Sequence, residues 1–177
     1  LRGAGYRFID APLAMSRQLE GLGRPVEDVS VEVTRGGDPA VMAEIADRAF
    51  EYGTTFRRAY SRLPGDRAHI HLASVDGKPV SCVATSDTTG NCSIDMVATL
   101  PEARGRGLSS ALLAHALADA AARGCRSTTL LSSKMGRGLY ERLGYVPFGF
   151  FEQWEPRSAA VDLRTGVTRR RYSPRVD

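Results

Sequence analysis

The stretch that decides the fold is Asp95-Met-Val-Ala-Thr-Leu-Pro-Glu-Ala-Arg-Gly-Arg-Gly-Leu-Ser-Ser110. Its apolar first part predicts a β-strand that ends at Pro101, because proline has no N–H for a strand ladder. A turn rich in glycine and arginine follows, and the residues from Leu108 to Ala122 are predicted to form a helix. The first N–H groups of such a helix lack intrahelical acceptors and favour a bound anion. The stretch therefore predicts a strand, a pyrophosphate-binding turn and a helix.

Two common phosphate-binding motifs do not account for this turn. No Gly-x-x-x-x-Gly-Lys-Ser/Thr string occurs, which excludes a P-loop. A dinucleotide fingerprint needs a third glycine where Ser110 stands, and an acidic residue near position 127, where there is none. What remains is the pattern Arg104-x-x-Gly107-x-Ser109.

This pattern resembles the acyl-CoA-binding signature of the GNAT acyltransferase superfamily, Arg/Gln-x-x-Gly-x-Gly/Ala. A second block, Gly138-Leu-Tyr-Glu-Arg-Leu-Gly-Tyr145, is similar to the last helix and following strand of that family. The two blocks cover about residues 92–150, and a weaker resemblance reaches back to about residue 29. Ser109 departs from the pattern, but serine is small and tolerated at the start of a helix.

The resemblance implies an α/β fold with a mixed, splayed central sheet between helices, where acyl-CoA enters the gap. The patterning agrees with this arrangement. Strands are predicted at 29–34, 69–75, 79–86, 92–100, 127–132 and 146–154, and helices at 38–53, 54–63, 108–123 and 138–143. We expect residues 29–155 to form the acyltransferase domain. Residues 1–28, with a strand at 6–9 and a helix at 13–22, are taken as an N-terminal extension or the remnant of a preceding segment, and residues 156–177 as a polar, basic tail.

The cofactor implied by the resemblance is acetyl-CoA or another short acyl-CoA. Its pyrophosphate is expected on the backbone N–H groups of a single turn, which comprises Arg104, Gly105, Arg106, Gly107, Leu108 and Ser109. Main-chain groups near Val97 and Thr99 are expected to pair with the pantetheine arm like an added strand.

Two residues are expected to take part in catalysis. By resemblance, Tyr140 donates a proton to the departing thiolate, which a phenol with an ordinary pKa near 10 is able to do. Asp95 is the candidate base, because it interrupts an apolar strand on the face that alternation assigns to Ser93 and Val97. The alternatives stay open: Tyr140 packs between helix and sheet, and Asp95 bonds a neighbouring loop. Tyr145 is expected in the core.

Other polar residues are assigned less directly. His69 and His71 point to the same side of their strand, but no third metal ligand accompanies them, so a relay role is considered. A solvated helical face is expected for Glu51, Tyr52, Arg57 and Arg58. Ser133 stands where relatives often carry an asparagine that faces the cofactor.

The function expected from these residues is acyl transfer from acyl-CoA to an amine-bearing acceptor, a small molecule or a protein. The alternative is a non-catalytic acyl-CoA-binding regulatory domain of the same fold. A nucleic-acid binder that uses Arg164, Arg169, Arg170, Arg171 and Arg175 is disfavoured, since that tail has one aromatic residue and no recognised signature.

Composition sets the remaining limits. A chain of 177 residues with 42% hydrophobic and 25% charged residues suits one α/β domain, and the net charge of +4 would attract a polyanionic cofactor. No apolar run reaches the ~18 residues of a membrane span, so no membrane partner is expected. Three cysteines without metal spacing, of which Cys82 and Cys92 lie in apolar runs, indicate buried free thiols and a cytoplasmic location. A homodimer is left open.

Overall fold

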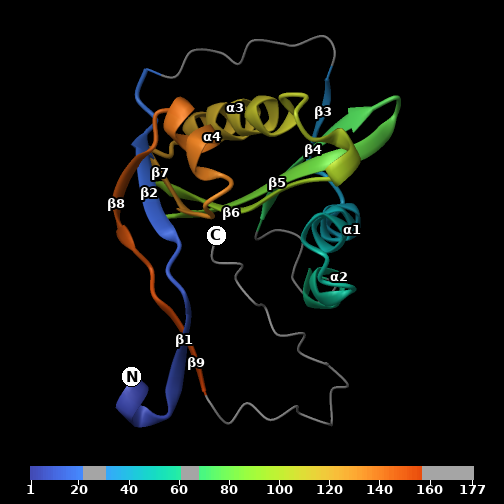
Figure 1. The fold of residues 1–177 in the computed structure, drawn as a ribbon. Coiled ribbons are helices and arrows are strands. Elements are labelled where there is room, and N and C mark those ends of the chain that lie inside the picture. Colours follow the sequence, from blue (N-terminus) through green and yellow to red (C-terminus); the bar gives the residue numbers. More distant parts are fainter. Residues whose placement is uncertain (22–30, 61–67, 157–177) are drawn as a thin grey trace. The chain divides into compact units, whose positions relative to one another are not determined.

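The structure, a computed structural model, describes residues 1–21, 31–60 and 68–156 of the chain (Figure 1). Its strands are β1 (Tyr6–Asp10), β2 (Leu13–Gln18), β3 (Glu32–Arg35), β4 (His69–Val75), β5 (Lys78–Thr88), β6 (Asn91–Thr99), β7 (Ser127–Ser132), β8 (Val146–Phe150) and β9 (Gln153–Pro156). Its α-helices are α1 (Pro39–Phe50), α2 (Thr55–Tyr60), α3 (Leu108–Ala122) and α4 (Arg137–Arg142). Short 3-10 turns lie at Arg2–Ala4 and Pro101–Ala103.

The chain divides into two compact units, of which Leu13–Gly149 is the larger. The larger unit is built on a seven-stranded sheet in the order β3-β4-β5-β6-β7-β2-β8. β6 and β7 run parallel, whereas β3–β4, β4–β5, β5–β6 and β2–β7 are antiparallel. The sheet is therefore mixed and lies between helices, as the sequence predicted.

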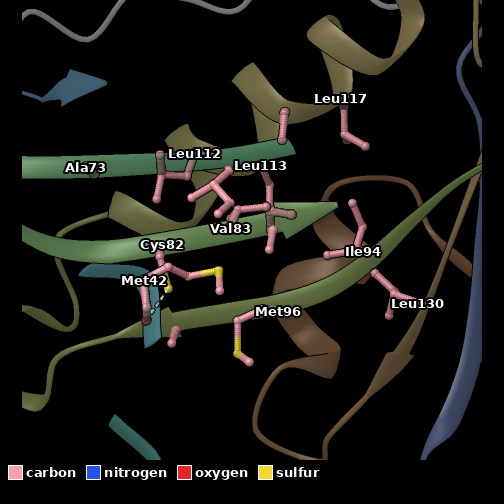
Figure 2. Close-up of a cluster of buried hydrophobic side chains, with 14 of the residues drawn as sticks. Met42, Ala73, Cys82, Val83, Ile94, Met96, Leu112, Leu113, Leu117 and Leu130 are labelled. Carbon is pink, nitrogen blue, oxygen red and sulfur yellow. Dashed lines mark hydrogen bonds between the residues drawn. The ribbon is translucent and has the colours of Figure 1, made fainter. Parts of the chain in front are cut away.

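Helices cover the two faces of this sheet, with α3 and α4 on one side and α1 and α2 on the other (Figure 1). On α3, Leu112, Leu113 and Leu117 are completely buried, and Figure 2 shows them against the strands that carry Ala73 and Val83. Met42 of α1 is equally buried and lies beside Cys82 of β5. Each such side chain contributes about 1.5–3 kcal/mol by leaving water, so this core fixes the sheet that carries the site.

The helix ends follow the local sequence. Asp38 caps α1 by accepting a hydrogen bond from the backbone N–H of Ala40 at 2.7 Å, and Pro39 occupies the first helical position. In the turn between β4 and β5, Asp76 and Gly77 both have positive φ values, of 51° and 70°, as a two-residue hairpin turn requires.

The helix predicted over residues 13–22 is wrong, because Leu13–Gln18 forms strand β2. β2 lies between β7 and β8, with Leu13 opposite Ser132 and Gln18 opposite Ser127. Its residue types favour a helix locally, but pairing with β7 and full burial of Met15 decide the outcome. A segment assigned to an N-terminal extension thus supplies a strand of the central sheet.

The smaller unit takes in Leu1–Pro12 and the chain from Phe150 onward. Within it β1 pairs antiparallel with β9, and the rings of Phe8 and Trp154 meet edge to face at 5.5 Å. The predicted strand at residues 6–9 is confirmed. The start of the strand predicted at 29–34, the end of the helix predicted at 54–63, and the tail with Arg169–Arg171 lie outside the described residues.

Candidate functional site: a splayed strand pair beside a glycine turn

The parallel strands β6 and β7 stay paired over only part of their length. Their register runs from Asn91 opposite Ser127 to Ile94 opposite Leu130, and no further pair follows among the described residues. β6 continues to Thr99, bonded on its other side to β5. The edge of β6 from Asp95 to Thr99 therefore offers its backbone groups to a ligand, which is the splay that the sequence predicted.

The predicted anion-binding turn lies at the end of this free edge. Gly105 and Gly107 both have left-handed φ values, 75° and 77°, and a Cβ atom at either would meet no atom within 4 Å. Gly107 is the N-cap of α3 and provides no side-chain hydrogen bond to the first turn. Open space therefore surrounds both glycines at the start of α3, where the first helical N–H groups lack intrahelical acceptors, and this turn fits a pyrophosphate.

The two arginines of the turn differ. The Arg104 side chain bonds within the protein. Its Nε donates to the backbone oxygen of Thr99 at 3.2 Å, and its Nη2 donates to the backbone oxygen of Ala49 at 3.0 Å. Its side chain therefore joins the end of α1 to the end of β6, a contact that the sequence analysis missed. The side chain of Arg106 is exposed beside the turn.

The other two turn residues contribute differently. Leu108 is 2% exposed, so only its backbone can reach a cofactor. Ser109, the departure from the family pattern, forms a 2.8 Å hydrogen bond with the hydroxyl of Thr99, which in turn bonds Ser81 at 2.7 Å. The hydroxyl that the family lacks here fastens the first turn of α3 to the end of β6.

β6 carries a β-bulge at Asp95. Ala84 pairs with Met96 and Thr85 with Ile94, so Asp95 is the extra residue. The thiol of Cys82 in β5 contacts the Met42 carbonyl of α1, so Cys82 faces α1. Its cross-strand partner Ala98 faces the same way, and so does Met96, which precedes Ala98 by two residues.

Strict alternation therefore fails along β6. Val97 shares the opposite face with Thr99, whose hydroxyl bonds Ser109 of α3. The expectation that Ser93, Asp95 and Val97 share one face is wrong for Val97, because the bulge shifts the alternation by one residue.

The Asp95 carboxylate is exposed and held by two hydroxyl groups. Ser86 donates to Oδ2 at 2.6 Å and Ser93 donates to Oδ1 at 2.7 Å. Ser86 and Ser93 are cross-strand partners, so both hydroxyls come from one rung of the β5–β6 ladder. The bulge and the two serines fix an ionisable oxygen pair on the face that α1 and α2 cover.

Tyr140 is buried in α4, the helix that follows β7. It is 8% exposed, and burial raises its pKa to about 12, so its phenol stays protonated at neutral pH. Its ring meets that of Tyr145 edge to face at 5.8 Å, and a Cβ atom at Gly136 would come within 2.9 Å of it.

Tyr145, by contrast, is a core residue, as expected from its place in the motif. It is 2% exposed, its hydroxyl lies 3.0 Å from that of Thr128, and burial raises its pKa. Ser133 acts locally by accepting a hydrogen bond from the Gly136 N–H at 3.2 Å.

The link between α1 and α2 is held by a buried carboxylate. Asp47 is 3% exposed and accepts hydrogen bonds from the backbone N–H groups of Phe56 at 2.8 Å and Arg57 at 3.1 Å. These are orphan donors at the start of α2, so Asp47 caps α2 from the neighbouring helix. The sequence analysis did not single out this residue.

The same link carries a cluster of aromatic rings, which we call the aromatic strip: Phe50, Tyr52 and Phe56, which contact one another, and Tyr60, which contacts Phe56. Neighbouring ring centroids lie 5.6–6.3 Å apart, and the rings of Tyr52 and Phe56 stack at an angle of 29°. Burial, followed by the nearby Asp95 carboxylate, raises the pKa of Tyr60. The sequence analysis missed this strip, although the i, i+4 spacing of Phe56 and Tyr60 is a signal that could have indicated it.

The two histidines lie on the face opposite Asp95. Their β5 partners are Thr85 and Val83, and His71 approaches Asp119 of α3 at 3.4 Å. His71 is 1% exposed, and neither ring nitrogen has a hydrogen-bond partner among the described residues. It lines, with His69 and Asp119, a cavity of about 290 Å³ at the start of β4. Because the sheet separates them from Asp95, they do not form a relay to it.

The described part of the chain contains no group of three or more histidine, cysteine or acidic side chains suited to a metal. Cys82 and Cys92 are buried free thiols, as expected, and burial raises the pKa of each to about 12. No helix among the described residues combines the length and apolar character needed to cross a bilayer.

Comparison with protein families identifies part of the chain directly. Residues 66–147 match the model of the acetyltransferase (GNAT) domain. This segment contains the splayed strands, the glycine turn, Asp95 and Tyr140. Comparison with curated proteins gave no significant match.

Solved structures share the fold over most of the chain. A GCN5-related N-acetyltransferase from Sphaerobacter thermophilus is 23% identical with a TM-score of 0.68, covering 92% of this chain and 56% of its own. One from Kribbella flavida is 21% identical with a TM-score of 0.63, covering 86% and 60%. The ribosomal-protein-S18-alanine N-acetyltransferase of Escherichia coli is 20% identical with a TM-score of 0.59, covering 75% and 97%.

The chain thus spans less than two thirds of the length of the Sphaerobacter and Kribbella proteins. At these identities the structures establish a shared fold, and the matched family model supplies the assignment. The glycine turn, the splay and these matches agree: residues 66–147 carry the acetyltransferase (GNAT) domain, and the chain shares the fold of the GCN5-related N-acetyltransferases.

Proposed function

We propose that this protein transfers an acetyl or other short acyl group from acyl-CoA to an amine by direct attack of the amine on the thioester. The observation that carries the proposal is the free edge of β6 ending at an uncapped helix with two left-handed glycines. An acyl-CoA has an extended amide-containing arm and a pyrophosphate, and these two features match an open strand edge and a helix N-terminus.

The residues that would hold the cofactor act through their backbone. The N–H groups from Arg104 to Ser109 would face the pyrophosphate, although the Arg104 N–H also bonds the Pro101 carbonyl at 3.3 Å. Arg106 adds exposed positive charge, while the Arg104 side chain stabilises the turn from behind. Val97 and Thr99 would pair with the pantetheine arm through main-chain atoms. The bound acyl-CoA supplies the activated acyl group.

Asp95 is proposed as the group that collects the amine proton. Only a neutral amine attacks a thioester, and an alkylamine in water is mostly protonated at neutral pH. Asp95 is exposed on the α1 face, and its two serine partners orient the carboxylate oxygens. This arrangement suits a base that accepts a proton directly or through a water.

Tyr140 is proposed as the acid that protonates the departing thiolate. Its phenol is protonated at neutral pH, since burial raises its pKa to about 12, and no hydrogen bond of its hydroxyl to a described residue is present. α4 follows β7, one of the two splayed strands, which brings this residue to the region of the gap. The proton would move from the phenolic oxygen to the sulfur as the thioester bond breaks.

Thiol release from acetyl-CoA, measured across a panel of amines, tests the proposal. Amine-dependent release that follows the concentration of the protein supports it. CoA binding by calorimetry without release for any amine would favour the non-catalytic acyl-CoA-binding domain instead.

A further inference from the structure

The aromatic strip leaves ring surface in water. Phe50 is 38% exposed and Tyr52 is 47% exposed, whereas Phe56 and Tyr60 pack partly against the core. A cluster of four rings with two exposed members is costly to leave uncovered, because each aromatic side chain offers a large apolar area. The strip therefore has a surface that a flat, apolar group would cover favourably.

The strip is also held in place. Asp47 fixes the start of α2 through two backbone hydrogen bonds, and the Tyr52 N–H donates to the Asp47 carbonyl at 3.0 Å. Thr55 in turn donates its hydroxyl to the Tyr52 carbonyl at 2.8 Å. The Tyr52 side chain has no part in these bonds, so the rings are presented by a backbone that does not depend on them.

The strip shares its face of the sheet with Asp95. α1 lies on the face marked by the Cys82–Met42 contact, and Asp95 bonds Ser86 and Ser93 on that face. The pKa of Tyr60, which ends the strip, is raised by burial and then by the Asp95 carboxylate. The aromatic strip and the exposed Asp95 carboxylate thus lie on one face of the sheet.

The charges around the strip narrow the type of ligand. Arg57 and Arg58 lie on α2, within the same short stretch of chain as the rings. Of the nearby acids, Asp47 is buried and pairs with Arg57 at 3.5 Å, which leaves Glu51 as the one exposed acid between Phe50 and Tyr60. A polyamine or aminoglycoside needs several carboxylates, and like charges on α2 would oppose it. A ligand with one amine and an uncharged body fits these charges better.

We propose that the acceptor is a small primary amine carried on a flat apolar body, in which the body lies on the aromatic strip and the amine reaches Asp95. This inference rests on the proposed acyl transfer, whose acceptor it specifies. The strip acts by holding the body through stacking, and Asp95 receives the proton that the amine loses as its nitrogen bonds to the acyl carbon.

Amines of equal carbon number test the inference: 2-phenylethylamine, 2-cyclohexylethylamine and n-octylamine, with spermidine as a polycation. We expect kcat/KM in the thiol-release assay to be about tenfold higher for 2-phenylethylamine than for n-octylamine, from stacking in addition to apolar burial. Equal values for the three monoamines, or a preference for spermidine, would overturn the inference while leaving acyl transfer established.

Tyr52→Ala tests the strip directly. It should lower kcat/KM for 2-phenylethylamine about fivefold or more, leave n-propylamine unaffected, and be rescued by Tyr52→Phe. Phe148→Ala is the matched control, since Phe148 is 65% exposed on β8, away from α1 and α2 in the strand order. Equal losses for both amines would contradict a role in holding the body.

Calorimetry with 2-phenylethylamine in the presence of CoA keeps the two proposals distinguishable. Binding that Tyr52→Ala weakens, without turnover, would support the strip and refute catalysis. Failure to bind while spermidine is acetylated would refute the strip alone. Should Tyr52→Ala convert an oligomer into a monomer in light scattering, the strip is an interface between copies and the acceptor assignment falls.

Discussion

Asp95 illustrates how one inserted residue creates an ionisable site on a strand. It lies on the same face as Ser93, at a β-bulge, and two serine hydroxyls at 2.6 and 2.7 Å hold its oxygens. The bulge then turns Val97 to the opposite face, so the side chains of Asp95 and Val97 point in opposite directions. The site thus depends on backbone register as much as on residue identity.

Asp95→Asn is expected to slow acyl transfer most at low pH. Asparagine keeps the shape of aspartate but cannot accept the amine proton, so the deficit should shrink as rising pH neutralises the amine in solution. The measurement is kcat/KM from pH 6 to pH 9 with one amine. A parallel loss at every pH would instead indicate that Asp95 orients the acceptor, and no loss would remove it from the mechanism.

Tyr140→Phe should preserve CoA affinity while lowering kcat by about 100-fold, which is typical for loss of a general acid. Its hydroxyl matters only as the thiolate leaves, so ground-state binding survives. Tyr145→Phe is a useful contrast, because its hydroxyl bonds Thr128 in the core and its loss should affect stability rather than kcat. A kcat of Tyr140→Phe within twofold of the parent, with chemistry limiting, would make Tyr140 a packing residue.

The sequence indicated which residues belong to the site better than it indicated the direction in which their side chains point. Asp95, Tyr140 and the turn glycines stood out because their types break a pattern or match a motif. The opposite faces of Val97 and Asp95 were missed, since a bulge has no clear signal in one sequence. The contact of Arg104 with Ala49 was missed because it joins residues distant in the chain.

The turn and helix α3 form the element on which cofactor binding depends. Both glycines lie in the left-handed region with open space around them, and the helix start lacks a side-chain cap. Any side chain at Gly107 carries a backbone cost of about 1 kcal/mol there. A test of the turn must therefore separate that strain from the effect of charge.

Gly107→Glu is expected to weaken CoA binding about tenfold more than Gly107→Gln. The two side chains have nearly the same shape and the same backbone strain, but only glutamate places negative charge against a phosphate. Isothermal titration calorimetry gives both affinities. As a check, saturating CoA should raise the melting temperature of the parent by linkage. Equal affinities for the two variants would show that charge at the turn is not important.

Elements with strong local signals, such as the helices predicted at 38–53 and 108–123 and the strands at 69–75 and 79–86, were predicted well, and β2 was not. The cap at Asp38, the Asp76-Gly77 turn and the glycine after α3 each act locally, so their signals lie in neighbouring residues. β2 is a strand only because β7 lies beside it, a contact that no local pattern of leucine, alanine, methionine and glutamine reveals.

For the molecule as a whole, a charged cluster joins β4 and β5 to the end of α3. Arg123 forms two hydrogen bonds to Asp87 and one to Asp119, and it lowers the pKa of Asp87. Buried His71 lies beside this cluster, 3.4 Å from Asp119, with Arg35, Arg123 and His115 also nearby. Burial lowers the pKa of His71, so the folded protein keeps this ring neutral.

Stability is expected to fall as pH drops from 7 toward 5. Below about pH 6.5 the unfolded chain protonates His71 while the folded protein does not, so the unfolded state binds more protons. The loss is at most about 1.4 kcal/mol per pH unit and ends at the folded pKa. Urea unfolding of the parent and His71→Leu at several pH values measures it. The variant should show a flatter profile, and identical profiles would contradict the assignment.

The position of β2 also bears on how the protein is made. A ribosome synthesises β2 long before β7 and β8, the two strands between which it lies. Until β7 has emerged, Leu13 and Met15 lack the strand with which they pair. β8 emerges later still and joins the sheet only beside β2. Folding during translation can complete the hairpin of β4 and β5 and dock α1 and α3 first. The sheet then closes last at a strand that was made among the first.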